Sequence, residues 1–497
     1  MLRPIIKESG LTVREVHLAR LANDTFLGLW SFPNVWRDEG IKQNGIGKEV
    51  ADLIVYFDNT VLIFSDKDIA FPQHKDIKVS WGRWFRSSVL ESEKQLRGAE
   101  AHIRRSPEKL FLDKKCTEKF PHELDINNLK IHLIAVTFNS YTPSKNYYDS
   151  MKPGSSGSLL CSFKTPTNEI QSLPFRINDL NPKKTFIHIL DEMTLDLLLK
   201  ELGNASDFIH YLEAKEYAVR KRNLFFAGGE EDILAHYLQE RTVKHRGFGK
   251  ISFPKTSEYD VIAIPEFEWR LYEQSIEYYR HRELLQKGLP WATVITSMAD
   301  GILSANVGEG AHLPFLTHER ALRFLASENS MSRAVLAEQL SSKYDSVPTD
   351  IRSSRCIESL CNPNRLYIFL FLPHNQNETY ESHRENRAAL MELYALVAKY
   401  KFPRITEIVV LATEPKGSAL SSMAVMAIDT SIPMDKSDQK FAKQIMLSEK
   451  ILNHVTSIKS TPKAKATPKK SPTSPPKQGR NSPCSCGSGL KTKKCCS

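Results

Sequence analysis

Four cysteines crowd into the last fourteen residues of this 497-residue chain, and their spacing suits a metal ion. They are Cys484, Cys486, Cys495 and Cys496. The Gly487-Ser-Gly489 turn lets the chain reverse, so that the second cysteine pair reaches the first. Four thiolates close a tetrahedral Zn²⁺ shell, with bonds of about 2.3 Å. Because such a shell leaves no open position for a substrate, we expect a structural zinc ion that supplies the folding free energy of this short segment.

Residues 479–496 as a whole resemble a known family. They carry Gly-Arg-Asn-x-Pro ahead of a Cys-x-Cys, eight-residue, Cys-Cys spacing, which is similar to the SEC-C module first known from the C-terminus of the SecA translocase ATPase. The resemblance implies zinc ligation by the four cysteines and a docking role on a ribosome, a chaperone or another protein. Ser485 stands where the family commonly has proline, and it is not a ligand. The sequence contains no Walker A pattern, so the resemblance does not extend to an ATPase.

A second group of reactive residue types surrounds a short pair of apolar runs. Leu53–Phe57 and Val61–Phe64 are separated by Asp58-Asn59-Thr60, a pattern typical of a β-hairpin. With Asp58-Asn59 as a two-residue turn, Phe57 faces Thr60, so the residue numbers of each cross-strand pair add up to 117. This register determines which side chains share a face of the sheet.

In that register an acid and a lysine meet at one end of the hairpin. Asp52 lies opposite Ser65, and Lys67 lies on the same face. A carboxylate in this position can hold Mg²⁺, and the ion can activate water and neutralise a phosphate. A nearby lysine can position or deprotonate that water, or stabilise developing charge.

Residues 47–67 resemble the metal-binding hairpin of the PD-(D/E)XK restriction-endonuclease-like superfamily, in which an Asp begins one strand and acid-x-Lys ends the next. The resemblance implies Mg²⁺-dependent hydrolysis of phosphodiester bonds in DNA or RNA, with Asp52 as a metal ligand and Lys67 assisting the water. The helix after the hairpin often carries a glutamine and basic residues in that family. Here it offers Gln95, with Lys94 and Arg97 beside it, and Gln95 would orient the site. The order helix, hairpin, helix, strand also agrees with that fold.

The second acid of the family pattern is missing, because Ser65 stands in its place. In the 117 register the adjacent Asp66 points to the other face. A three-residue loop would shift the sum to 118 and put Asp66 opposite Asp52, but it would turn Lys67 away. Alternatively, Glu49 supplies the missing carboxylate from just before the first strand. The sequence leaves these alternatives open, together with an inactive site that only binds nucleic acid.

The elements that must position these residues follow from hydrophobic periodicity. It predicts a helix over 11–30, a basic amphipathic helix over 86–103 and a strand over 130–138. Residues 151–158 are expected to form a flexible loop. Further strands are expected over 185–190, 365–372, 407–412 and 423–428. Further helices are expected over 191–220, 230–239, 266–285 and 381–401. Residues 191–220 should form two helices, the second capped by Asn204 or Ser206.

These elements predict an α/β protein in four parts. A restriction-endonuclease-like domain over 1–225 is followed by a second α/β domain over 226–455, in which we find no chemistry. A disordered basic linker rich in Lys, Pro, Ser and Thr covers 456–480, and the zinc-binding tail covers 481–497. Trp81 and Trp84 are expected in the core rather than on a base-stacking surface.

Charge is distributed unevenly along the chain. The net charge is +10, and the residues after 450 include ten basic side chains and no acid, so residues 1–450 balance to zero. Such a tail attracts polyanions such as nucleic acid, ribosome or an acidic lipid surface. The balanced body favours nucleic-acid binding only through a local basic patch. Candidates for that patch are Lys78, Arg83, Arg86, Lys94, Arg97, Arg104 and Arg105.

Composition also indicates the cellular compartment of the protein. We find no signal peptide and no apolar run near the ~18 residues of a membrane span. The chain has eight cysteines, of which four lie scattered through the body, and this is not a disulfide scaffold. We therefore expect a cytoplasmic protein. The nuclease hypothesis has one rival, a non-catalytic adaptor whose zinc tail docks on a ribosome, chaperone or other protein.

Overall fold

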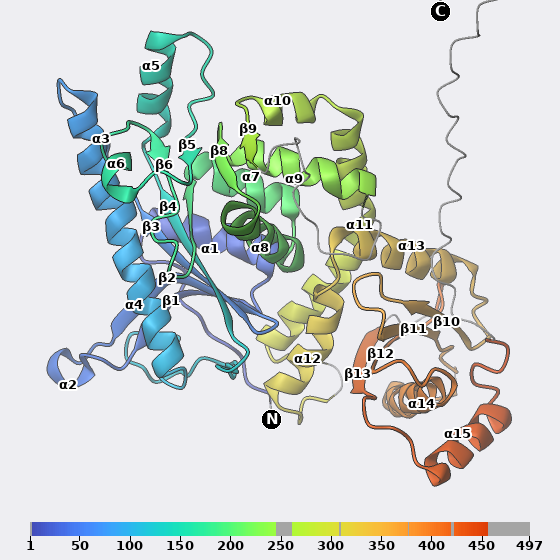
Figure 1. The fold of residues 1–497 in the computed structure, drawn as a ribbon. Coiled ribbons are helices and arrows are strands. Elements are labelled where there is room, and N and C mark those ends of the chain that lie inside the picture. Colours follow the sequence, from blue (N-terminus) through green and yellow to red (C-terminus); the bar gives the residue numbers. More distant parts are fainter. Residues whose placement is uncertain (1, 245–260, 308–309, 376, 419–421, 456–497) are drawn as a thin grey trace, which may run out of the picture. The chain divides into compact units, whose positions relative to one another are not determined.

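The computed structural model describes residues 2–244, 261–307, 310–375, 377–418 and 422–455. In this described part, three β-sheets are surrounded by helices, which confirms the mixed α/β class (Figure 1). None of the described helices is long and apolar enough to cross a membrane. The linker and the zinc tail expected from the sequence lie outside the described residues.

The first sheet has the strand order β1-β2-β3-β4-β7. Strands β1, β2 and β3 are antiparallel neighbours, whereas β4 and β7 run parallel to β3. Its strands are β1 (Ser31–Arg37), β2 (Lys48–Phe57), β3 (Thr60–Lys67), β4 (Lys130–Thr137) and β7 (Ile187–Asp191). Strand β1 was not predicted, because Pro33 breaks the pattern of a regular strand and a bulge follows at Val35–Trp36.

The hairpin of β2 and β3 has the two-residue turn. Phe57 pairs with Thr60 and Leu53 with Phe64, so the paired positions sum to 117, and the alternative sum of 118 is wrong. Asp58 and Asn59 have φ angles of 47° and 59°. Two consecutive left-handed residues form the type I′ turn, whose twist matches that of the paired strands.

Helices cover both faces of the first sheet (Figure 1). The ring of Phe64 lies 6.3 Å from that of Phe26 in α1 (Val13–Phe26). The hydroxyl of the next residue, Ser65, lies 3.0 Å from Gln95 Oε1 in α4 (Glu91–Arg105). Because neighbours in a strand point to opposite faces, α1 and α4 lie on opposite sides of the sheet.

Helix α4 continues a longer helical run. It follows α3 (Ile77–Phe85) and η1 (Arg86–Leu90) without a break. Trp81 and Trp84 are fully buried in this run, which confirms their place in the core. On the opposite face, α7 (Glu192–Leu202) and α8 (Ala205–Lys221) accompany α1, and Asn204 is the N-cap of α8. Shorter helices are α2 (Ile41–Asn44), α5 (Tyr141–Met151) and α6 (Thr167–Ile170).

The second sheet is small and has the order β6-β5-β8-β9. Its elements are β5 (Leu160–Ser162), β6 (Arg176–Ile177), β8 (Leu224–Ala227), α9 (Glu230–Lys244), β9 (Ile262–Ile264) and α10 (Glu268–Glu273). The segment before β5, for which the sequence predicts a flexible loop, is anchored. The Ser156 N–H donates to Glu266 at 2.6 Å, and the Ser158 hydroxyl donates to Glu231 at 2.5 Å.

The third sheet has the order β10-β11-β12-β13. Trp291 packs edge-on against Tyr367, so α11 covers one face of this sheet. The strands are β10 (Ser353–Glu358), β11 (Arg365–Phe371), β12 (Glu407–Thr413) and β13 (Met423–Asp429), and the helices around them are α11 (Ile276–Leu303), α12 (Phe315–Ala326), α13 (Ser330–Ser346), α14 (Tyr380–Lys401) and α15 (Lys436–Ser448).

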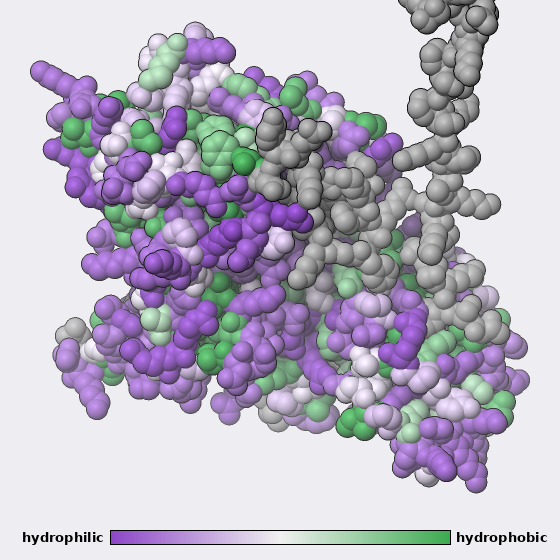
Figure 2. All heavy atoms as spheres, in the orientation of Figure 1, coloured by the Kyte–Doolittle hydropathy of each residue, from purple (hydrophilic) through white to green (hydrophobic). Residues whose placement is uncertain are grey.

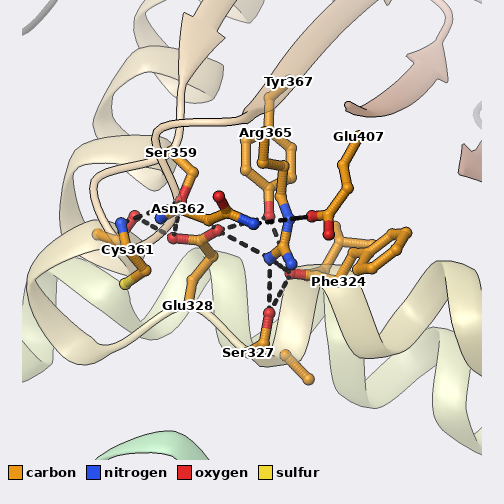
Figure 3. Close-up of polar contacts among 12 residues, drawn as sticks. Phe324, Ser327, Glu328, Ser359, Cys361, Asn362, Arg365, Tyr367 and Glu407 are labelled. Carbon is orange, nitrogen blue, oxygen red and sulfur yellow. Dashed lines mark hydrogen bonds and ion pairs between the residues drawn. The ribbon is translucent and has the colours of Figure 1, made fainter. Parts of the chain in front are cut away.

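A buried polar network joins the turn between α12 and α13 to the third sheet (Figure 3). The Glu328 carboxylate is fully buried and accepts hydrogen bonds from Ser359, at 2.7 Å, and from Tyr367, at 2.9 Å. It also lies 3.2 Å from the guanidinium of Arg365, which pairs with Glu407 at 2.7 Å. Every charge in this network faces an opposite charge or a hydroxyl group, as a buried charge requires.

Candidate functional site

The candidate site lies where β2 and β3 separate. Their hydrogen-bonded pairing ends at Leu53 and Phe64, and beyond that point β2 continues beside β1 while β3 continues beside β4. A pocket of about 340 Å³ opens at this fork, between the strands and α4. Its polar lining includes Lys48, Glu49, Asp52, Ser65, Lys94 and Gln95.

Asp52 lies in this pocket with one carboxylate oxygen already fixed. Its Oδ2 accepts the backbone N–H of Asp66 at 2.5 Å. Burial raises the pKa of Asp52, while this hydrogen bond and the charge of Lys67 lower it. Asp52 is therefore a positioned carboxylate whose charge is only partly compensated.

Glu49 is the second carboxylate on the pocket wall, and Asn34 holds it. The Asn34 Nδ2 donates to Glu49 Oε1 at 2.7 Å and to Glu15 Oε2 of α1 at 2.9 Å. Burial raises the pKa of Glu49 to about 7, and the charge of Asp52 adds to this rise, although the Asn34 hydrogen bond opposes it. Asn34 itself is fully buried and has a φ of 47°, a left-handed conformation that asparagine tolerates.

Asp66 does not line the pocket. Strand alternation places its side chain on the face opposite Ser65, and both carboxylate oxygens are buried without a hydrogen-bond partner among the described residues. Burial and repulsion by Asp52 raise its pKa to about 7. Of the two acids that the sequence leaves open beside Asp52, the structure therefore brings Glu49 into the pocket. Asp66 contributes its backbone N–H.

Ser65 and Gln95 meet on the α4 side of the pocket. The Ser65 hydroxyl is buried and lies 3.0 Å from Gln95 Oε1 and 3.3 Å from Ser92 Oγ. The Gln95 Nε2 donates to no described residue. The hydrogen bond that Oε1 accepts from Ser65 therefore orients the Gln95 amide group, and its N–H groups are available to a ligand.

Lys67 is a half-buried cation that does not line the pocket. Its charge lowers the pKa of both Asp52 and Glu49. In the part of the chain that the structure describes, its ammonium group makes no hydrogen bond or ion pair. An ammonium group without a fixed partner is available to a water molecule or a phosphate oxygen.

The residues fit a hard cation with few protein ligands. Among the described residues, no three Asp, Glu, His or Cys side chains come together closely enough to hold one metal ion. Mg²⁺, however, is commonly held by one or two carboxylates, with water and substrate phosphate completing its shell. Asp52 and Glu49 supply two oxygen-bearing groups whose raised pKa values reflect charge that a cation would compensate.

Sequence reasoning missed Asn34 and Glu15. The Thr12-x-x-Glu15 spacing is that of a helix-capping motif, and Thr12 does accept the Glu15 N–H, so this pattern marks the start of α1. It says nothing of a link to Glu49, because that link passes through Asn34 in the missed strand β1.

The other candidate residues have the following places. On α4, Arg97 pairs with Glu93 at 3.1 Å and Arg104 with Glu100 at 3.0 Å, so the proposed basic patch is partly neutralised. The body cysteines are free thiols, and Cys484, Cys486, Cys495 and Cys496 lie outside the described residues.

Comparisons of the chain with protein-family models, with curated proteins and with solved structures find no match.

Proposed function

We propose that this protein is a metal-dependent nuclease that hydrolyses phosphodiester bonds in DNA or RNA. The observation that carries the proposal is the shared pocket of Asp52, Glu49 and Gln95, and the charge of Lys67 lowers the pKa of both acids. Two carboxylates can hold a divalent ion that activates water, and a nearby cation can stabilise the charge that develops on the phosphate.

The arrangement of the first sheet supports a restriction-endonuclease-like fold for this region. Helix α1, the β2–β3 hairpin, helix α4 and strand β4 follow each other in the order expected of that superfamily. The hairpin carries Asp52 and Lys67, and α4 carries Gln95. Ser65 departs from the family pattern, and Glu49, which lines the same pocket as Asp52, would supply the missing acid.

Each residue has a separable role in the proposed reaction. Asp52 and Glu49 would hold Mg²⁺, and the bound ion would neutralise a phosphate oxygen and activate water. Lys67 would stabilise the charge that develops on the phosphate as the water attacks. Gln95, fixed through its oxygen beside Ser65, would donate its N–H to the substrate backbone. A place in defence against foreign nucleic acid belongs to the same proposal.

The test is cleavage of DNA and RNA with Mg²⁺ or Mn²⁺ by wild type, Asp52→Asn, Glu49→Gln and Lys67→Met. Asp68→Asn is the control, because Asp68 is an exposed acid directly after β3 that pairs with Arg14. We expect losses of about 100-fold or more for the three site variants and an unchanged control. Equal background cutting in all proteins, or none in any, would reject the nuclease and leave the non-catalytic adaptor.

The tail carries a second, independent part of the proposal. The spacing of Cys484, Cys486, Cys495 and Cys496 supports a structural Zn²⁺ site. The tail that this ion folds would dock the protein on a ribosome, a chaperone or another protein. Metal analysis of the full chain should find about one zinc ion per molecule. The double substitution Cys484→Ser/Cys486→Ser should remove it without changing the unfolding temperature of the body. Full zinc content in that variant would place the metal elsewhere.

A further inference from the structure

The turn over residues 113–119 packs against the start of β2, beside the pocket. The Gly47 N–H donates to the Lys114 carbonyl oxygen at 2.8 Å. A Cβ atom at Gly47 would lie 2.6 Å from Cys116 Sγ, so glycine permits this close approach. The residue after Gly47 is Lys48, which lines the pocket. The turn is therefore a direct neighbour of the pocket along β2.

This turn is fixed by hydrogen bonds at both of its sides. The Asp113 carboxylate accepts the backbone N–H groups of three later residues of the turn, at 2.7 to 3.0 Å. Just before the turn, Phe111 exchanges two backbone hydrogen bonds with Trp36 of β1. The exposed side chains of Lys114 and Lys115 therefore extend from a fixed backbone.

Exposed lysines occupy the turn, the start of β2 and the connection between β1 and β2. They are Lys42, Lys48, Lys114, Lys115 and Lys119. In the part of the chain that the structure describes, none of these five ammonium groups makes an ion pair. Figure 2 shows mainly hydrophilic side chains around α2, at the lower left of the view. The five lysines are therefore available to an anionic partner.

The acids of the same region do not cancel this charge. Residues 37–48 and 109–119 together carry seven basic and four acidic side chains, a net charge of +3. Three of the four acids are engaged: Asp38 by Lys109 at 3.4 Å, Glu39 by Arg37 at 2.6 Å, and Asp113 by its own turn. The fourth, Glu118, is exposed. Clustered charge of one sign attracts polyanions.

Helix α4, on the other side of the pocket, offers less free positive charge. Lys94, Arg97 and Arg104 each have an acid within 4 Å, three or four residues away on the same helix. Nucleic-acid binding depends on lysine and arginine contacts that neutralise phosphates. The unpaired lysines beside β2 therefore suit a phosphate backbone better than the helix on which the sequence led us to expect a basic patch.

We propose that Lys42, Lys48, Lys114, Lys115 and Lys119 form a basic track that holds the phosphate backbone of the substrate nucleic acid next to the pocket. The proposal rests on the nuclease function given above and names the surface on which its substrate lies. Lys48 belongs to the track and also lines the pocket, so it connects the two. Contacts with phosphates position a nucleic acid without reading its bases, so the track has little sequence preference.

Adjacent lysines permit a matched test of the track. Lys114→Gln/Lys115→Gln removes two of its charges. The control is Lys183→Gln/Lys184→Gln, a second pair of adjacent exposed lysines in a turn that a side-chain oxygen fixes. This pair precedes β7, at the opposite edge of the first sheet. Lys114→Arg/Lys115→Arg keeps the charge. Because all of these side chains are exposed, the unfolding temperature should stay unchanged.

The experiment measures the affinity of the full chain for a short DNA duplex, a DNA single strand and an RNA strand, with Ca²⁺ in place of Mg²⁺, at several salt concentrations. We expect Lys114→Gln/Lys115→Gln to lose about tenfold in affinity near 0.1 M salt. The slope of log affinity against log salt should become shallower by about 1.5 to 2, for two lost phosphate contacts. The control pair and the arginine variant should bind as wild type does. The basic tail is present in every protein and contributes equally.

Equal losses in the two glutamine variants would mean that total charge sets the affinity, and would overturn the proposal. Unchanged binding in Lys114→Gln/Lys115→Gln would overturn it as well. Cleavage with Mn²⁺ is measured separately, so that the two proposals can fail independently. Wild type that cuts while the track variant binds and cuts equally well would leave the nuclease without the track. Track-dependent binding without any cleavage would keep the track and reject the nuclease.

Vesicles that contain phosphatidylserine test the other anionic surface that lysines can bind. We expect the track variant and wild type to differ on nucleic acid and not on these vesicles. Loss of vesicle binding in Lys114→Gln/Lys115→Gln, with unchanged binding of nucleic acid, would assign the lysines to a lipid surface and overturn the proposal.

Discussion

The backbone N–H of Asp66 donates a hydrogen bond to Oδ2 of Asp52, with 2.5 Å between the two atoms, at the point where β2 and β3 separate. This contact joins the two strands after their regular pairing has ended. It orients the Asp52 carboxylate while the side chain of Asp66 stays on the other face of the sheet. The geometry of the fork thus decides which acid accompanies Asp52.

Restoring the missing acid should strengthen the site. In Ser65→Asp, a carboxylate would line the same pocket as Asp52, where Ser65 now lies buried beside Gln95. We expect the metal-free variant to be less stable by about 1–3 kcal/mol, because a buried charge lacks its partner. Affinity for Mn²⁺ should rise about tenfold, since each added charged ligand strengthens a hard-cation site. Calorimetric titration and thermal unfolding measure both, with Ser65→Asn as the uncharged control. Weaker Mn²⁺ binding in Ser65→Asp would place the metal away from Asp52.

Metal affinity should depend on pH through Glu49. Its pKa is raised from 4.5 to about 7, so the folded protein without metal keeps this proton at pH values where the unfolded chain has lost it. The contribution of this group to stability is therefore greatest below about pH 4.5 and is lost as pH rises through 7. Because a metal ion needs the carboxylate, binding releases a proton and weakens as pH falls below 7. Mn²⁺ titrations at pH 6 and pH 8 measure this difference. Glu49→Gln should show a flatter pH dependence, and an unchanged slope would exclude Glu49 as a ligand.

Two buried histidines should sensitise the fold to acid. His132 and His188 lie on neighbouring strands β4 and β7, with ring centroids 5.8 Å apart, and none of their ring nitrogens has a hydrogen-bond partner among the described residues. Burial lowers the pKa of His132 from 6.5 to about 4 and holds that of His188 well below its usual value.

The unfolded chain therefore takes up protons on both residues below pH 6.5, whereas folded His132 does not do so until about pH 4. Each histidine should reduce the free energy of unfolding by about 1.4 kcal/mol per pH unit as the pH falls below 6.5. Denaturant unfolding at pH 7 and pH 5 measures the loss. The double variant His132→Leu/His188→Leu should lose less than wild type, and the exposed-residue control His74→Gln should not differ from it. Equal losses in the double variant and wild type would contradict the lowered pKa values.

The Glu328–Arg365 pair should be essential to the stability of the described body. Glu328→Leu would leave the guanidinium of Arg365, which is 6% exposed, with only one of its two carboxylate partners. Removing one member of a buried ion pair typically costs about 3–5 kcal/mol. The double variant Glu328→Leu/Arg365→Met should recover part of this loss, because the buried guanidinium is removed together with its carboxylate, while Glu407 keeps only its hydrogen bond from Asn362. Denaturant unfolding tests the cycle, and additive losses would mean that the two residues act independently.

The hairpin was predictable because its determinants are local. Asp58 and Asn59 tolerate the left-handed conformation of a two-residue turn, and the alternation of apolar residues sets the register from that turn. The register predicts Asp52 and Ser65 at one end of the hairpin, and the family resemblance adds Gln95; all three line one pocket. The same local reasoning placed Trp81 and Trp84 in the core.

The choice between Glu49 and Asp66 was not predictable, because it depends on contacts between distant parts of the chain. Asn34 holds Glu49 in place. It belongs to β1, which lacks a regular strand pattern because of Pro33 and a bulge. Amino-acid order by itself determined the reactive residue types, the turn and the cysteine spacing of the tail. Only the tertiary structure decided which carboxylates share a pocket, because strand separation, burial and the partners of each buried charge arise from packing.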